Sequence, residues 1–309
     1  MFGTAGSVDD PPGGCSRKTN ILWPFALSSR IPLDRAAGSL RLGMELSGRS
    51  ALLTGATGGL GREIAAALAA GGAKLVLSGR KADALEALAA ELPGEEHRVL
   101  PSDLAEPGAA EKLAAEAGGV DILVANAGLP ATGRLTDFSS EKLTGALRVN
   151  LEAPILLARA LEPTMLERGS GHMVFISSLS GKSATPLSSI YNATKFGLRG
   201  FALGLRADLD PKGIGVSLVS PGTIREAGMY SDSGAPPIKG LGTGTPKQVA
   251  DAVVKAIERN KVEVTVAPPQ QRLLAHFALA TPGLSVKIAS GDAGQKAAAV
   301  VAKGQSDKR

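Results

Sequence analysis

The sequence predicts an α/β fold, in which a doubly wound parallel sheet of about seven strands carries helices on both faces. From Ser50 onward, short apolar runs alternate with longer stretches of helical periodicity. The runs are rich in Val, Leu and Ile without alternation, which is typical of strands that helices cover on both faces. The repeated strand–helix–strand order requires crossover connections, which are right-handed. We therefore expect a single domain that binds ligands at the carboxyl ends of its strands.

Each element follows from its own run of residues. The strand pattern occurs at residues 51–54, 74–78, 98–101, 121–125, 172–177, 215–220 and 262–266. The helical pattern occurs at residues 60–70, 81–91, 106–117, 139–168, 188–209 and 246–259. Beyond Pro268 the pattern predicts one or two further helices over the side of the sheet where a ligand would lie.

The two ends of the chain read differently from its middle. Residues 1–43 contain Asp9-Asp10-Pro11-Pro12-Gly13-Gly14 and a short apolar stretch that Pro24 interrupts, so we expect a disordered extension. A small excess of basic residues leaves a targeting segment as the alternative. The pattern favours a functional chain that begins at Met44, a domain over residues 44–270 and a helical tail over residues 271–309.

Composition excludes several classes of protein. With 44% hydrophobic and 20% charged residues, a disordered or fibrous chain is excluded. One cysteine and three scattered histidines predict neither a disulfide framework nor a metal site. A net charge of +5 without a basic block, and 3% aromatic residues, argue against nucleic-acid binding. Because no apolar run reaches membrane-spanning length, we expect a cytoplasmic protein without an integral membrane segment.

A glycine-rich turn follows the first strand and opens the first helix. Gly55 allows a tight turn, Gly59 allows the backbone to approach a pyrophosphate, and Gly61 lets the helix pack closely on the sheet. The helix N-terminus then offers free N–H groups to the phosphates. The residues expected to bind a dinucleotide in this turn are Gly55, Thr57, Gly58, Gly59, Leu60 and Gly61.

The end of the second strand predicts which dinucleotide binds. NAD-binding proteins place an acidic residue there, which accepts from the ribose 2′-hydroxyl. This chain has Gly79 followed by Arg80, whose guanidinium can pair with a 2′-phosphate. We therefore expect NADP(H) to be favoured over NAD(H).

These and later motifs resemble the short-chain dehydrogenase/reductase family, in its short branch, over residues 44–270. Thr54, Gly55, Gly59 and Gly61 match the glycine pattern, and Tyr191 and Lys195 match the Y-x-x-x-K element. Ser178 precedes Tyr191 by the 13 residues usual in the family. The resemblance implies a Rossmann-like fold and an NAD(P)(H)-dependent oxidoreductase that acts on a carbonyl or secondary alcohol. It adds these expected cofactor contacts: Asp103, Leu104, Asn126, Ala127, Gly128, Tyr191, Lys195, Pro221, Gly222, Thr223 and Ile224.

The resemblance also implies a catalytic group of Asn150, Ser178, Tyr191 and Lys195. Tyr191 and Lys195 stand four residues apart in a helical pattern, so they project from one face. A free tyrosine has a pKa of about 10, and a neighbouring ammonium lowers the pKa of a phenol by stabilising the phenolate. Tyr191 would then donate the proton, while Ser178 binds the substrate oxygen. In the family, the residue at Asn150 holds a relay water and the lysine also holds the nicotinamide ribose.

One position departs from the family pattern. After the sixth strand the family usually carries a threonine that contacts the nicotinamide, and this chain has Glu226 there. Residues 226–245 are rich in Gly, Ser and Pro and predict a mobile loop over the substrate, in which Met229 and Tyr230 are the bulky members.

Two other functions fit parts of the pattern. Thr54, Gly55, Gly58 and Gly61 also suit a nucleotide-sugar epimerase of the extended branch, although the chain is short for one. A non-catalytic NADP-sensing protein would be expected to lose Tyr191 or Lys195. The partner we expect is a small carbonyl or alcohol substrate, within a homodimer or homotetramer that the resemblance implies. For the tail, a packed helix is favoured over a lid, a dimer contact or peripheral membrane contact.

Overall fold

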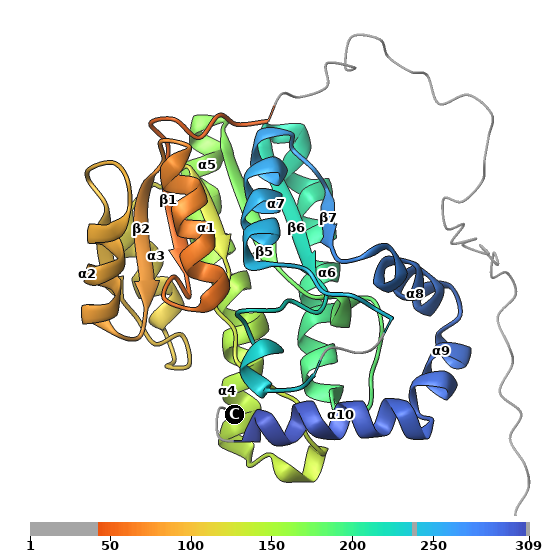
Figure 1. Cartoon of the computed structure of the whole chain (residues 1–309). Helices are drawn as coiled ribbons and strands as arrows, with labels where there is room; N and C mark the ends of the chain where they lie inside the picture. Colours follow the sequence, from red (N-terminus) through yellow and green to blue (C-terminus); the bar gives the residue numbers. More distant parts are fainter. Residues whose placement is uncertain (1–42, 237–239, 307–309) are drawn as a thin grey trace, which may run out of the picture. The chain divides into compact units, whose positions relative to one another are not determined.

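A computed structural model describes residues 43–236 and 240–306 (Figure 1). Its sheet has seven parallel strands in the order β3-β2-β1-β4-β5-β6-β7, which confirms the predicted fold class. The strands are β1 (Ser50–Thr54), β2 (Lys74–Gly79), β3 (Arg98–Pro101), β4 (Ile122–Ala125), β5 (Gly171–Ile176), β6 (Ile214–Pro221) and β7 (Glu263–Val266). The strand order changes direction between β1 and β4, and such a switch point opens a crevice at the carboxyl ends of the strands. The prediction for the N-terminal extension falls outside the described residues, apart from Gly43.

Two apolar layers sandwich the sheet. One is formed with α1 (Gly59–Ala70), α2 (Ala82–Glu91) and α7 (Pro246–Glu258), and includes Leu53 of β1. The other is formed with α3 (Ala109–Ala117), α5 (Ala153–Arg168) and α6 (Ser189–Leu209), and includes Leu52 of the same strand. Neighbouring side chains of one strand thus enter opposite layers, which explains why the strands are apolar without alternation.

The helical run predicted at residues 139–168 is divided in the structure. It consists of α4 (Ser140–Leu147), a π-helical turn η2 (Arg148–Glu152) and α5, and the Ser139 hydroxyl caps its beginning. A π turn inserts a wider loop of backbone into a helix and is frequent at functional sites. This turn carries Asn150 and packs against α6, which carries Tyr191 and Lys195.

Three helices follow β7, where the sequence predicted one or two. They are α8 (Pro269–Ala280), α9 (Pro282–Ala289) and α10 (Asp292–Gly304). Pro269 and Pro282 each begin a helix, a position at which the missing N–H group costs nothing. Figure 1 shows α10 crossing below the carboxyl edge of the sheet. Over the ranges that the structure describes, no helix has the length and apolar character needed to cross a membrane.

Candidate active site

A cavity of about 430 Å³ lies at the carboxyl ends of β4, β5 and β6. Its size suits a small organic ligand. The loop after β6 and the helices α8 and α10 form the wall that faces the strand ends. The expected site residues that line the cavity are Leu60, Asn126, Gly128, Ser178, Tyr191, Lys195, Pro221, Gly222, Thr223 and Ile224. The remaining ones do not line it and lie in the turn and first residues of α1, after the ends of β2, β3 and β4, and in η2: Gly55, Thr57, Gly58, Gly59, Gly61, Arg80, Asp103, Leu104, Ala127 and Asn150.

The glycine-rich turn is fixed to the loop that follows β4. Gly55 has a φ of +65°, and a Cβ there would lie 2.8 Å from the Cα of Ala127, so only glycine fits without strain. Asn126 Nδ2 donates to the carbonyl oxygens of Thr54 (3.0 Å) and Gly55 (3.1 Å). In return, Thr54 Oγ1 accepts from the N–H groups of Asn126 and Ala127, at 3.1 Å each. These four bonds fix the turn after β1 to the loop after β4, on the two sides of the crevice.

The start of α1 is suited to an anion. Its N-cap is Gly58, and no side chain caps this end of the helix. The N–H groups of the first turn are therefore available to a phosphate, and the helix dipole favours negative charge there. The turn that begins the helix thus fits the pyrophosphate of a dinucleotide, as the sequence predicts.

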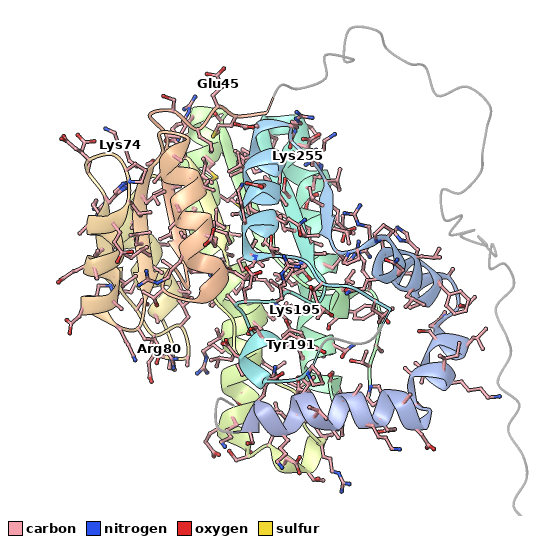
Figure 2. All side chains as sticks on the ribbon, viewed as in Figure 1. Glu45, Lys74, Arg80, Tyr191, Lys195 and Lys255 are labelled. Atoms are coloured by element: carbon pink, nitrogen blue, oxygen red, sulfur yellow. The ribbon has the colours of Figure 1, made fainter. Side chains whose placement is uncertain are left out.

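Arg80 lies at the carboxyl end of β2 and is exposed. Figure 2 places it at the same edge of the sheet as Tyr191 and Lys195. No acidic group among the described residues forms an ion pair with its guanidinium, so the charge is open to a ligand. At the end of β3, Asp103 Oδ1 accepts from the N–H of Ala105 at 3.0 Å, and Leu104 is buried.

Tyr191, Lys195 and Ser178 meet at the cavity. Tyr191 and Lys195 lie one turn apart on α6, and Lys195 Nζ is 5.7 Å from the centroid of the Tyr191 ring (Figure 2). Lys195 Nζ also donates to the carbonyl oxygen of Ile176 at 2.9 Å, which ties it to the end of β5. Ser178 Oγ accepts from the N–H of Ser180 at 3.1 Å and forms a hydrogen bond with the Tyr191 phenol. A phenol, an ammonium and a hydroxyl therefore surround one point of the cavity.

Burial shifts the pKa values of both Tyr191 and Lys195. Burial raises the pKa of Tyr191 to about 12, against the opposing effect of its hydrogen bond with Ser178. Burial likewise lowers the pKa of Lys195 to about 8. For the chain without a bound dinucleotide, burial of the phenol thus outweighs its hydrogen bond with Ser178, and the lowered phenol pKa expected beside bound nicotinamide stays a prediction. In this state Tyr191 carries its proton at neutral pH and can donate it.

Asn150 lies behind the cavity wall, where it is fully buried. Its Oδ1 accepts from the N–H of Leu129 at 2.7 Å, and its Nδ2 donates to the carbonyl oxygen of the same residue at 2.9 Å. The side chain thus fixes the loop that carries Gly128. Its role in holding a relay water stays a prediction, since these two bonds occupy the amide.

Glu226 turns away from the cavity. Its Oε1 accepts from Arg225 Nε at 2.6 Å, its φ is +73°, and it does not contribute to the cavity wall. Ala227 and Gly228, the next two residues, lie over Gly59 and Leu60 instead. Glu226 therefore does not replace the usual threonine in the cavity, and backbone and small side chains occupy that region.

Sequence reasoning missed two glutamines that line the cavity. Gln271 Oε1 accepts from the N–H of Thr223 at 3.0 Å, and its Nε2 donates to the carbonyl oxygens of Leu241 and Gly242 at 3.3 and 2.9 Å. Gln305 Nε2 donates to the carbonyl oxygen of Met229 at 2.9 Å. Both contacts join residues far apart in the chain, and no local motif marks them. Met229 and Tyr230, which the sequence singled out, do line the cavity.

Comparison with known proteins assigns the family. The family model described as short chain dehydrogenase matches residues 49–236. Dehydrogenase/reductase SDR family member 7B of Bos taurus is 36% identical over 259 residues, which cover 77% of this chain and 79% of the relative. Ketoacyl reductase HetN of Nostoc sp. is 37% identical over 227 residues, covering 72% and 79%.

Solved structures agree with this relationship. A metagenomic short-chain oxidoreductase in complex with NADP has a TM-score of 0.62 and 33% identity, covering 73% of this chain and 99% of that one. A short-chain dehydrogenase from Sphingobium yanoikuyae in complex with NADPH has a TM-score of 0.67 and 30% identity, covering 76% and 94%. The Tyr191–Lys195 pair, the glycine-rich turn and these matches lead to one conclusion: this chain belongs to the short-chain dehydrogenase/reductase family and is an NAD(P)-dependent oxidoreductase.

Proposed function

We propose that this protein uses NADP(H) to reduce a carbonyl group, in a ketone, an aldehyde or a 3-oxoacyl compound, to a secondary or primary alcohol. The observation that carries the proposal is the convergence of Tyr191, Ser178 and Lys195 on one cavity beside the glycine-rich turn. The name of the Nostoc relative, a ketoacyl reductase, supports a 3-oxoacyl substrate. The NADP and NADPH complexes of similar structures support the cofactor, as does Arg80, which has no ionic partner within residues 43–236 and 240–306.

Some of the site residues would bind the cofactor, and others would bind the substrate oxygen and transfer the proton. The α1 N-terminus would hold the pyrophosphate, Arg80 the 2′-phosphate, and residues 221–224 the nicotinamide end. Bound NADPH supplies the hydride. Ser178 donates a hydrogen bond to the substrate oxygen, where negative charge develops, and Tyr191 gives that oxygen its proton. Lys195 then stabilises the phenolate that remains.

The raised pKa of Tyr191 fits the direction of reduction. A phenol with a pKa of about 12 is protonated at neutral pH and is ready to act as an acid. The extended-branch epimerase and the non-catalytic sensor gain no specific support from the described residues. Cytoplasmic location and assembly as a homodimer or homotetramer stay predictions.

The Tyr191→Phe variant tests this proposal. The substitution keeps the ring in place and removes the proton donor, so kcat/KM for NADPH-dependent reduction should fall by about 100- to 10,000-fold. The assay follows NADPH oxidation against ketones, aldehydes and 3-oxoacyl thioesters. Tyr230→Phe makes the same chemical change at a tyrosine whose hydroxyl donates to the carbonyl oxygen of Pro236, and a far smaller loss is expected there. Full reduction by Tyr191→Phe would overturn the proposed function.

A further inference from the structure

One helical face closes the substrate side of the cavity. Ala297 and Val301 of α10, and Gln305 directly after its end, follow each other at intervals of four residues, and all three line the cavity. Ala298 of α10, Leu274 and Ala275 of α8 extend this wall. Apart from Gln271 and Gln305, the wall that these two helices present is apolar.

The end of α10 is attached to the loop that follows β6. A methyl group added at Gly304 would clash with the backbone carbonyl of Ser233, which lies in the short turn η5 (Ser231–Ser233). Next to it, Gln305 Nε2 donates to the carbonyl oxygen of Met229 at 2.9 Å. Gln305 is therefore held in a defined position, where it is only 4% exposed.

The other half of the Gln305 amide has no partner. Its Oε1 is buried and accepts no hydrogen bond from any group in residues 43–236 or 240–306. The orientation of the amide is fixed, because only the NH₂ group can donate to the carbonyl of Met229. Gln271 provides a contrast, since its oxygen and its nitrogen are both bonded. Buried acceptors are nearly always satisfied in native proteins, so this one points to a donor supplied by a ligand.

We propose that Gln305 determines substrate specificity by accepting a hydrogen bond from an O–H or N–H group of an otherwise apolar carbonyl substrate. This donor is a second polar group of the substrate, separate from the carbonyl that Tyr191 and Ser178 bind. The inference rests on the proposed carbonyl reduction. A substrate that lacks the donor leaves Oε1 buried without a partner, so the site discriminates against it.

Two series of substrates distinguish the hydroxyl from the amide as the source of the donor. The first compares straight-chain methyl ketones with ketones that carry one hydroxyl at successive positions along the same chain. The second compares 3-oxoacyl thioesters of N-acetylcysteamine, which has an amide N–H, with their N-methylated counterparts. In each pair, kcat/KM with NADPH is measured for the wild type, Gln305→Met and Gln305→Ala.

In at least one series, the wild type should prefer the compound with the donor by about tenfold. Gln305→Met, which is apolar and similar in length, should abolish the preference, mainly by lowering kcat/KM for the compound with the donor. Gln305→Ala, which removes the acceptor without adding bulk, should abolish the preference as well, and it serves as the test if the methionine variant does not fold. Gln295→Met, at an exposed position of α10, should leave the ratio unchanged.

A wild type that reduces these compounds without any donor preference would overturn the inference and leave the proposed function intact. The same holds if the preference survives in Gln305→Met. If the wild type reduces no compound of either series, and no other ketone or aldehyde, the proposed function fails as well.

Discussion

Arg80 is the residue on which cofactor choice is expected to depend. Its guanidinium is exposed and has no ionic partner among the residues described, whereas Lys74, at the other end of β2, is paired with Glu96 (Figure 2). Exposure alone is ordinary for an arginine. Its position at the carboxyl end of the second strand indicates a role in cofactor binding, because the ribose of the adenosine lies there in folds of this type.

Arg80→Gln should reduce kcat/KM for NADPH about 10- to 100-fold and leave kcat/KM for NADH nearly unchanged. The range corresponds to loss of a charge-assisted hydrogen bond of about 1.5–3 kcal/mol. Steady-state kinetics with both cofactors measure the effect, and Lys74→Gln is the matched control. An equal loss with NADPH and NADH would contradict a 2′-phosphate contact.

The pH dependence of the reaction tests the role of a second residue, Lys195. Burial lowers its pKa to about 8, so the ammonium is present below this pH and is lost above it. We expect kcat/KM for NADPH, which reports the free enzyme, to decline as pH rises through about 8. In Lys195→Arg the side chain stays charged, and the decline should move to higher pH. A profile that is unchanged by this substitution would show that Lys195 is not the titrating group.

Motifs close together in sequence predicted the residue-scale site best. The spacing of Tyr191 and Lys195 on one helix is enough to place both at the cavity, and the spacing of Gly55 and Gly59 is enough to place both at the start of α1. The orientation of Glu226 could not be predicted from its position in the motif. Its position in the motif suggested a place beside the nicotinamide, but a positive φ and the bond with Arg225 turn it outward.

At the level of elements, an ion cluster joins β7 to the segment between β5 and α6, which carries Ser178. Lys182, which follows η3 (Leu179–Gly181) and is 4% exposed, contacts Glu263 Oε1 at 2.9 Å. Arg199 of α6 contacts Glu263 Oε2 at 3.3 Å. Burial acts to raise the pKa of Glu263, but its hydrogen bonds and charge attraction with Lys182 and Arg199 outweigh burial and lower it. One carboxylate thus connects three elements around Ser178 and Tyr191.

Glu263→Gln should lower the free energy of unfolding at pH 7 by about 2 kcal/mol, because it leaves Lys182 buried without its anion. The carboxylate stabilises the fold above the pKa of the unfolded chain, and this contribution is lost as pH falls through the lowered pKa. The difference between wild type and variant should therefore shrink in acid. Urea unfolding measures it, and Asp251→Asn, which removes an exposed pair with Lys247, should cost at most about 0.5 kcal/mol.

Long-range contacts explain what the sequence left open at this scale. The helix predicted at residues 139–168 is real, but its π turn at Asn150 reflects packing against α6 and the bonds with Leu129. Gln271 and Gln305 contact loops about 30 and 76 residues away, and no periodicity encodes such pairings. Apolar runs specify an element, whereas tertiary contacts decide its irregularities.

For the molecule as a whole, a buried histidine predicts sensitivity to acid. His172 of β5 hydrogen-bonds Ser217 of β6 at 2.8 Å in the middle of the sheet. Burial, with Arg206 acting in the same direction against Asp210, lowers the pKa of His172 to about 3. The folded protein keeps this ring neutral in a range where the unfolded chain takes up a proton.

The free energy of unfolding should therefore not depend on His172 above about pH 6.5. As pH drops from there toward 3, it should fall by up to about 1.4 kcal/mol per pH unit. His172→Gln, which retains a group able to bond Ser217, should show a shallower decline. Unfolding free energies across this pH range measure both slopes. His276→Gln changes an exposed histidine and should behave as the wild type, while equal slopes for His172→Gln and wild type would contradict the assignment.

The position of α10 in the chain has a consequence for the order in which the protein is made. The strands, the glycine-rich turn and α6 all precede it, so a growing polypeptide can complete its dinucleotide half before the last wall of the cavity has been synthesised. A chain shortened just before Asp292 would retain the strands, the glycine-rich turn and α6, and would lack α10. Such a product would keep the nucleotide cradle while losing the surface that selects what is reduced.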